Sequence, residues 1–152
     1  MQKRKLIIAP LLLSLLTLFS CNKEDDIETI FVGRTWYMNG ATINGLKLNS
    51  DIKNFYTEAG DAAYYITFSQ TTFRGALSHD VTFSGTWQAD GKRQTITLNF
   101  TQNPSADSTF DKDLYHILSD ITSYESGADF LTLKKDNSNL IRLADSRTKV
   151  YN

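Results

Sequence analysis

Residues 80–100, DVTFSGTWQADGKRQTITLNF, alternate between apolar and polar side chains and constrain the fold more than any other part of the chain. In the first half, one face is apolar or small: Val81, Phe83, Gly85 and Trp87. The second half repeats the pattern with Ile96, Leu98 and Phe100. The dipeptide Asp90-Gly91 between the halves is typical of a hairpin turn. We therefore expect two antiparallel strands with one buried face.

Further stretches have the composition of strands, rich in β-branched and aromatic residues and bounded by polar turns. They are residues 62–69, 71–77, 129–135 and 140–144. A first strand is expected around Trp36 and Met38, which share one face, and Asn44-Gly45 has the composition of the turn that ends it. The short connections in the middle of the chain favour an antiparallel meander of four strands.

Two segments have the periodicity of amphipathic helices. Residues 109–124 place their apolar side chains on a single stripe: Phe110, Leu114, Ile117, Leu118, Ile121 and Tyr124. Ser108 and Asp111 resemble a capping box at the start of this helix. Residues 50–59 predict a shorter helix that stops at Gly60. The sequence thus predicts an α+β fold, with both helices packed on an antiparallel sheet or a partly open barrel of about seven strands.

The first twenty residues have the features of a processing segment. Residues 2–5 are polar and mostly basic, and an apolar run follows from Leu6 to Phe19. The run is shorter than the roughly 20 apolar residues of a transmembrane helix, but it suits the apolar region of a signal peptide. We predict that residues 1–20 are a signal peptide and form no part of the folded domain.

The residues that follow, Leu18-Phe19-Ser20-Cys21, resemble the lipobox of bacterial lipoproteins. In that family a peptidase cleaves before the cysteine, whose thiol carries a diacylglyceryl group and whose new amino group is acylated. The resemblance implies that Cys21 is lipidated and that the mature chain is held on a membrane by acyl chains without spanning it. Two or more chains hold a protein stably on a bilayer.

A short charged run follows the cysteine: Lys23, Glu24, Asp25 and Asp26. It resembles the export signal of Bacteroidetes-type lipoproteins, which implies a location on the outer face of the outer membrane. A solvated, flexible tether is the other interpretation, and both can hold at once. We expect residues 21–30 to be the lipidated tether and residues 31–152 to form a single globular domain.

Cysteine count and charge exclude several kinds of chemistry. Cys21 is the only cysteine, so the domain contains no disulfide and no cysteine-based zinc site. Without residues 1–20, the chain keeps 13 of its 16 basic residues against 17 acidic ones, a net charge of −4. That charge argues against nucleic acid as a partner and leaves the membrane, through the anchor, as the predicted one.

The order of elements resembles two families of small envelope lipoproteins. The Trp36 strand, YYITFSQTTFRG and the terminal helix–strand–strand segment are similar to the META domain, which implies a compact β-rich domain without an established catalytic activity. The motifs GRTW and FSGTWQADGKRQTITL resemble the lipocalin-like lipoproteins, which implies a barrel with a cavity for an apolar ligand.

The sequence offers little support for catalysis or metal binding. The two histidines, His79 and His116, have no companions at metal-ligand spacing. The acids around the start of the long helix, such as Asp111, are explained by the positive end of its dipole. No G-x-S-x-G motif is present. We predict no catalytic residue, no metal and no cofactor.

The aromatic side chains are the remaining candidates for ligand binding, although an aromatic on the inner face of a strand usually belongs to the core. Tyr64 and Tyr65 are neighbours on a predicted strand, so one of them faces outward. We predict a ligand site formed by Tyr64 and Tyr65 together with Trp36 and Trp87. The favoured function is a non-catalytic binding or accessory domain for a small molecule or a protein. A lipocalin-like carrier and a hydrolase are the alternatives.

Overall fold

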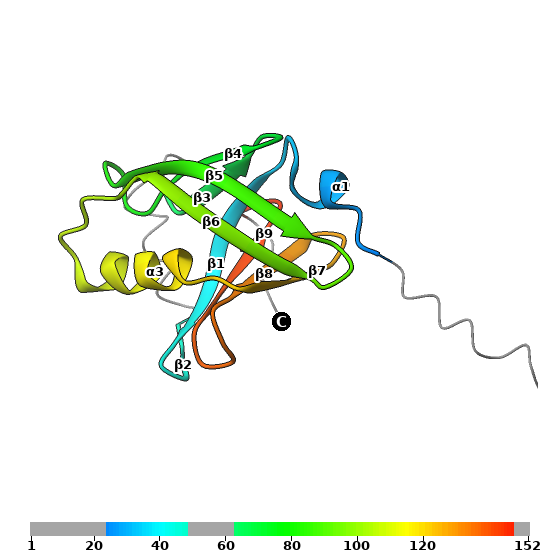
Figure 1. Cartoon of the computed structure of the whole chain (residues 1–152). Coiled ribbons are helices and arrows are strands. Elements are labelled where there is room, and N and C mark those ends of the chain that lie inside the picture. The colour runs from blue at the N-terminus through cyan, green and yellow to red at the C-terminus, as the bar shows by residue number, and fades with distance from the viewer. Residues whose placement is uncertain (1–23, 49–62, 148–152) are drawn as a thin grey trace, which may run out of the picture.

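The structure, a computed structural model, describes residues 24–48 and 63–147. Figure 1 shows the arrangement of these elements around one barrel. In chain order they are α1 (Ile27–Phe31), β1 (Thr35–Ile43), β2 (Leu46–Lys47), β3 (Tyr65–Phe68), β4 (Thr72–Ala76), β5 (Thr82–Asp90), β6 (Thr95–Gln102), α3 (Thr109–Ser119), β7 (Ser123–Ser126), β8 (Phe130–Lys134) and β9 (Leu140–Ala144).

The strands form one antiparallel sheet in the order β2-β1-β3-β4-β5-β6-β7-β8-β9, and β1 also pairs with β9. That second pairing closes eight strands into a barrel, while β2 extends the end of β1. The predicted α+β class and the meander from β3 to β6 are confirmed. The barrel is closed rather than partly open, because the nine-residue β1 is long enough to pair with β3 near its start and with β9 along most of its length.

The core fills the inside of the barrel. Strands β5 and β6 contribute the predicted inward side chains, among them Phe83, Trp87, Ile96 and Leu98, which are all buried. Helix α1 adds Phe31, which is fully buried and lies 5.1 Å, ring centroid to centroid, from each of Phe68, Trp87 and Tyr124. Phe31 therefore closes one end of the aromatic core.

Helix α3 covers the place where β6 and β7 separate. These two strands share a single register pair, Thr95 with Ser123, and α3 contacts β6, β9 and β1. In Figure 1 the helix runs beside the half of β6 that β7 does not reach. Its buried side chains Leu114, Ile117 and Leu118 belong to the predicted stripe, which is confirmed over this stretch.

The prediction that this helix continues to residue 124 is wrong. The helix ends at Ser119 with Asp120 as its C-cap, and residues from Ser123 onward form β7. The backbone N–H of Tyr124 donates to the carbonyl of Gln94 over 3.0 Å, and that of Thr122 donates to Lys134 over 3.0 Å. Pairing with strands distant in sequence thus overrides the helical periodicity. The strands β2 and β7 were not predicted: β2 has only two residues, and β7 begins inside the segment that was predicted as helix.

The domain also begins before residue 31, contrary to the predicted boundary. Asp26 caps α1, and its carboxylate accepts from the backbone N–H of Thr29 over 3.2 Å and from its hydroxyl over 2.9 Å. The backbone N–H of Asp25 donates to Gly91 over 3.1 Å. Residues 25–30 are therefore part of the fold rather than of a tether. The predicted helix at 50–59 and residues 1–23 lie outside the described part of the chain.

Candidate functional site

The outer face of strands β4, β5 and β6 carries an array of uncharged polar side chains. The alternation that buries Phe83 and Trp87 turns every second residue toward solvent. The uncharged outward residues of the three strands are Thr72, Thr82, Ser84, Thr86, Gln88, Thr95, Thr97, Asn99 and Thr101. None of the described strands lies over this face, because all nine belong to the one sheet. We refer to these nine residues together as the hydroxyl face.

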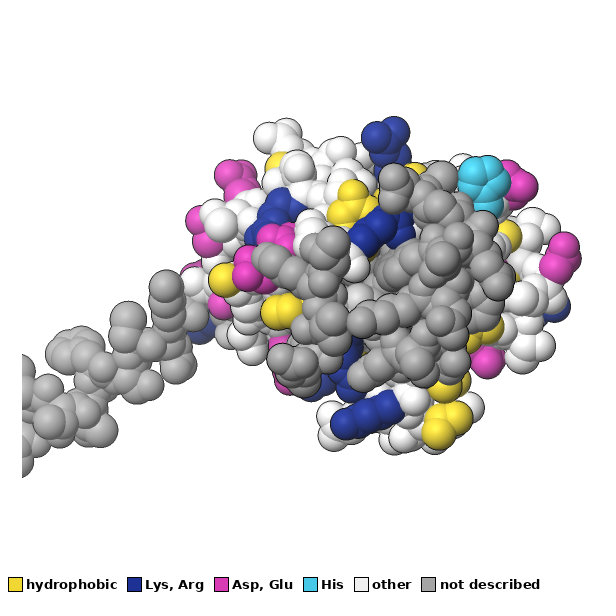
Figure 2. All heavy atoms as spheres, turned by 180° about the vertical axis from the view of Figure 1, so that it is seen from behind, with side chains coloured by type: hydrophobic (Ala, Val, Ile, Leu, Met, Phe, Trp, Pro, Cys, Tyr) yellow, Lys and Arg dark blue, Asp and Glu magenta, His cyan; other side chains and the backbone are white. Residues whose placement is uncertain are grey.

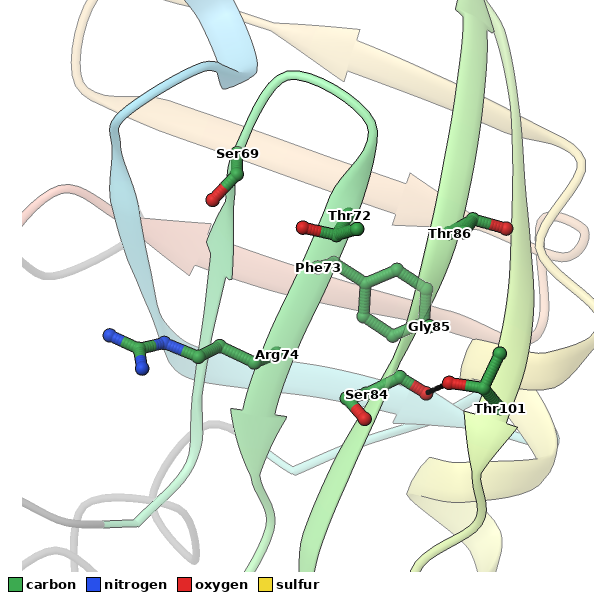
Figure 3. A pocket seen from close by; sticks show the side chains of 8 residues that line it. All are labelled: Ser69, Thr72, Phe73, Arg74, Ser84, Gly85, Thr86 and Thr101. Atoms are coloured by element: carbon green, nitrogen blue, oxygen red, sulfur yellow. Dashed lines mark hydrogen bonds between the residues drawn. The ribbon is translucent and has the colours of Figure 1, made fainter.

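Part of the hydroxyl face is hollowed into a shallow depression of about 280 Å³. Figure 3 shows its lining: Ser69, Thr72, Phe73, Arg74, Ser84, Gly85, Thr86 and Thr101. The register between β5 and β6 shifts between Ser84 and Gly85, which is the mark of a β-bulge. Gly85 has no room for a side chain, since an added Cβ would stand 2.0 Å from the carbonyl oxygen of Asn99. The bulge and Gly85 both lie in the lining of the depression.

Hydrogen bonds hold the side chains at the lower end of this depression in place. The hydroxyl of Thr101 donates to the carbonyl of Ser84 over 3.4 Å, and the hydroxyl of Ser84 donates to Oε1 of Gln102 over 3.4 Å. The amide of Gln102 donates in turn to the hydroxyl of Thr82 over 3.2 Å. Both strands therefore present a connected set of donors and acceptors.

The hydroxyl face differs in charge from the opposite side of the molecule. Arg74 is the one charged side chain lining the depression, and in Figure 3 its guanidinium points away from Thr86 and Thr101. The described part of the opposite side, seen in Figure 2, carries both basic and acidic side chains, with hydrophobic ones among them. A neutral array of hydroxyl and amide groups suits an uncharged polar ligand better than an ion.

The four predicted ligand-binding residues do not meet at the surface. Trp36 is 0% exposed, Tyr64 2% and Trp87 6%, and Tyr65 is partly exposed. The indole N–H of Trp36 donates to the carbonyl of Ile30 over 3.1 Å, and that of Trp87 to the carbonyl of Ser69 over 2.9 Å. Their polar groups are thus satisfied by the protein itself. A ligand role for the four residues stays a prediction, and it would require the packed barrel to open.

Tyr64 contributes instead to a buried polar network. Its hydroxyl donates to Oδ1 of Asp111 over 3.1 Å, and the hydroxyl of Ser78 donates to Oδ2 over 2.6 Å. The backbone N–H of Asp111 donates to the hydroxyl of Ser108 over 3.0 Å, as the predicted helix cap requires. Burial, and then the neighbouring carboxylate of Asp111, raise the pKa of Tyr64 well above its ordinary value. The network joins three separate segments of the chain.

The described residues contain no cluster of three or more histidine, cysteine or acidic side chains that could hold a metal. His116 is exposed on α3, and Nε2 of His79 lies 4.0 Å from the carboxylate of Asp80 at the surface. Among these residues, no helix has both the length and the apolar character to cross a bilayer.

The predicted export signal is partly built into the fold. Lys23 lies outside the described residues, and Glu24 is exposed. The Asp25 carboxylate accepts from the side-chain amide of Gln94 over 3.1 Å and from the hydroxyl of Ser126 over 3.4 Å. Hydrogen bonds from Thr29 hold the pKa of Asp26 below its ordinary value. No local pattern indicates the Asp25 contacts, because their partners lie 66 or more residues away.

Comparison with known proteins places the chain in one family. The model of a domain of unknown function, DUF4847, matches residues 22–144. The fold is similar to the crystal structure of a DUF4847 family protein from Bacteroides vulgatus ATCC 8482, with a TM-score of 0.64 and 24% sequence identity over 81% of this chain and 99% of that one. No curated protein matches the chain.

Proposed function

Because the chain belongs to the DUF4847 family, whose function is unknown, we propose a function from its own residues. The protein is a lipid-anchored envelope protein whose barrel is a non-catalytic binding module. Its hydroxyl face binds an uncharged, hydroxyl-rich ligand of the glycan class. The single observation that carries the binding role is the array of hydroxyl groups around the depression at Gly85, whose lining contains one charged side chain, Arg74.

Two observations support the anchor. The apolar run ends in Leu18-Phe19-Ser20-Cys21, which resembles a lipobox, and the family match begins directly after it at residue 22. Residues 1–20 then act as a signal peptide, and Cys21 carries the acyl chains. The run from Lys23 to Asp26 directs export to the outer face of the outer membrane.

The binding role rests on surface chemistry. Each hydroxyl of threonine or serine offers one donor and two lone pairs, so a row of them matches the groups of a sugar. A carrier of apolar ligands is less well supported, because the inward side chains Phe83, Trp87 and Leu118 occupy the interior. The depression around Gly85, and another lined by Gln88, Thr95 and Thr97, lie on strands at the outer surface.

The anchor is tested by growing cells with a labelled fatty acid. We expect the wild-type chain to be labelled and to partition with membranes, and Cys21→Ala to do neither. Continued labelling of the alanine variant would overturn the anchor.

The proposed export signal, Lys23 to Asp26, needs a variant that keeps α1 capped, because Asp26 is its N-cap. Asp26→Ser combined with Glu24→Gln preserves a capping oxygen and removes two charges. We expect this variant to remain lipidated but to lose protease accessibility on whole cells.

The binding role is tested by sedimentation with two insoluble neutral polysaccharides, cellulose and curdlan, and with heparin-agarose as a charged comparison. The protein is the chain from residue 21 with Cys21→Ala. We expect binding to at least one neutral polysaccharide and weaker binding to heparin. Combined Ser84→Ala, Thr86→Val and Thr101→Val should weaken binding at least tenfold, since three lost hydrogen bonds of about 0.5–1.5 kcal/mol each sum to about 1.5 kcal/mol or more. The control, Thr122→Val with Ser138→Ala, removes exposed hydroxyls elsewhere and should bind normally. Failure to bind either neutral polysaccharide, or equal loss in the control, refutes the glycan class.

A further inference from the structure

The contacts of Asp25 connect the N-terminal segment to one end of the barrel. Its backbone N–H donates to Gly91 in the β5–β6 turn over 3.1 Å, and its carboxylate accepts from Gln94 and from Ser126 at the end of β7. Gly91 has no room for a side chain on this side, because an added Cβ would stand 2.2 Å from the carbonyl oxygen of Asp25. Asp25 therefore lies in a fitted position between two turns.

The chain after Asp25 is tied to the core. Asp26 caps α1, and Phe31 at the end of α1 is fully buried against three aromatic rings. The Tyr124 side chain is buried, and its pKa is raised by that burial and by the nearby carboxylates of Asp25 and Asp90. Asp25 is thus the first residue of a segment that cannot swing freely around the barrel.

An antiparallel up-and-down barrel has two distinct ends. The β5–β6 and β7–β8 turns, with α1, lie at the end where Asp25 docks; we refer to it as the anchor end. The β1–β2 and β8–β9 turns lie at the other, where Gly45 donates to Ser138 over 2.9 Å and Asn44 donates to Asn139 over 3.0 Å. Strand β1 alone has nine residues, about 30 Å of chain at 3.3 Å per residue. After a tilt of 35–45°, the two ends are still separated by roughly 20 Å.

The sequence distance from the lipid site to Asp25 is short. Three residues, Asn22, Lys23 and Glu24, separate Cys21 from Asp25. Four steps of about 3.8 Å give a maximum reach of about 15 Å between the two Cα atoms. That reach is smaller than the separation of the barrel ends, so the inverted orientation, with the opposite end on the bilayer and the Asp25 end pointing away from it, is excluded while Asp25 stays docked.

From these distances we infer that the docking of Asp25 sets the orientation of the barrel on the membrane. The anchor end faces the phospholipid headgroups, and the β1–β2 and β8–β9 turns face away. The inference rests on the proposed lipidation of Cys21. Lys92 and Arg93 at the tip of the β5–β6 turn lie within reach of headgroup phosphates, whereas Glu24 and Glu28 at the same end oppose that attraction. The short spacer, rather than the charge, therefore keeps the anchor end close to the bilayer. The hydroxyl face on the side of the barrel stays open to ligands beside the membrane.

The test uses the full lipidated protein in phosphatidylcholine vesicles. The thiol of Cys21 is consumed by the lipid, so a second cysteine can be labelled selectively with a fluorophore. Ala128→Cys places the label in the β7–β8 turn at the anchor end, and Asn137→Cys places it in the β8–β9 turn at the other end; both positions are exposed. Quenching by lipids that carry a nitroxide at the headgroup then reports the distance of each label from the bilayer.

We expect at least twofold stronger quenching at position 128 than at position 137. The control variant has twelve Gly/Ser residues inserted between Lys23 and Glu24, so it keeps the Asp25 contacts. The root-mean-square length of such a linker is about 5–6 Å times the square root of its residue number, which lengthens the spacer by roughly 20 Å. It should abolish the difference between the two labels. Equal quenching at the two positions with the native spacer, or a difference that survives the insertion, overturns the inference.

Flotation of the vesicles separates the two proposals. Protein that fails to float refutes the anchor, whereas protein that floats without a quenching difference refutes only the orientation.

Discussion

The hydroxyl of Tyr64 donates a 3.1 Å hydrogen bond to the carboxylate of Asp111, and both side chains are buried. The contact joins the residue before β3 to the first turn of α3, 47 positions away. Tyr64 adopts a φ of 53°, a left-handed conformation that is costly for a bulky residue. Its N–H and carbonyl still pair with Leu77 and Met38, over 2.6 and 2.8 Å. The surrounding contacts therefore hold Tyr64 in an unfavourable backbone conformation.

Removing this hydroxyl should destabilise the fold. We expect Tyr64→Phe to lower the free energy of unfolding by about 1.5–3 kcal/mol, the range for a hydrogen bond to a charged group. Tyr65→Phe removes the same atom from the neighbouring, partly exposed residue and should change stability by less than about 0.5 kcal/mol. Urea unfolding measures both, and equal effects would show that the network contributes nothing specific.

Stability should fall at alkaline pH. The pKa values of Tyr64 and Tyr124 are raised in the folded state, mainly by burial. Folding therefore favours the protonated phenols, and this contribution is complete below the unfolded value near 10. It is lost as the pH rises above about 10, because the unfolded chain then releases protons that the folded one retains. Urea unfolding between pH 8 and 11 should show this decline, and Tyr64→Phe should make it shallower. An unchanged slope in the variant would contradict the prediction.

The packing of Phe31, at the end of α1, against the aromatic core should be essential to stability. Phe31→Ala removes a fully buried ring from contact with Phe68, Trp87 and Tyr124. We expect a loss of about 3–5 kcal/mol, typical of a buried phenylalanine. Leu46→Ala is the control, because Leu46 is 65% exposed. Thermal unfolding followed by near-ultraviolet circular dichroism measures both. A change below about 1 kcal/mol for Phe31→Ala would show that α1 is dispensable.

The close approach at Gly91 predicts a contrast between two glycines. A Cβ on Gly91 would meet the carbonyl oxygen of Asp25 at 2.2 Å, whereas one on Gly127 finds its nearest neighbour at 3.7 Å. We expect Gly91→Ala to cost about 1–3 kcal/mol through displacement of the Asp25 segment, and Gly127→Ala to be close to neutral. Urea unfolding gives the two values. Amide exchange at Asp25 should increase in the first variant alone, and protection that stays unchanged there would argue against the close fit.

Local patterns predicted the parts of the fold that local chemistry determines. The alternation over residues 80–100 and the turn Asp90-Gly91 gave the β5–β6 hairpin, and the stripe through Leu114 and Leu118 gave the buried side of α3. The same stripe failed beyond Ser119, because Tyr124 is equally able to point inward from a strand that pairs with β8. Periodicity records which side chains are apolar but not which backbone partners are available.

The candidate site was harder to predict for a similar reason. Every residue of the hydroxyl face was visible as the polar half of an alternating strand, which is also what an ordinary solvated sheet displays. The depression depends on the bulge at Ser84 and Gly85 and on the alignment of three strands. The predicted aromatic site drew on Trp36 and Trp87, which are buried because the sheet closes around them.

By itself, the sequence determined the β-rich class, the meander of four strands, the cap and buried stripe of α3, and the resemblance of Cys21 to a lipidation site. These features depend on neighbours within a few residues, where side-chain period and turn chemistry act directly. Only the tertiary structure decided that β1 pairs with β9 to close the barrel, that Asp25 docks on Gly91, and that Tyr64 meets Asp111. Those contacts join residues far apart in the chain, and their free energy depends on the packing of the whole barrel rather than on any local pattern.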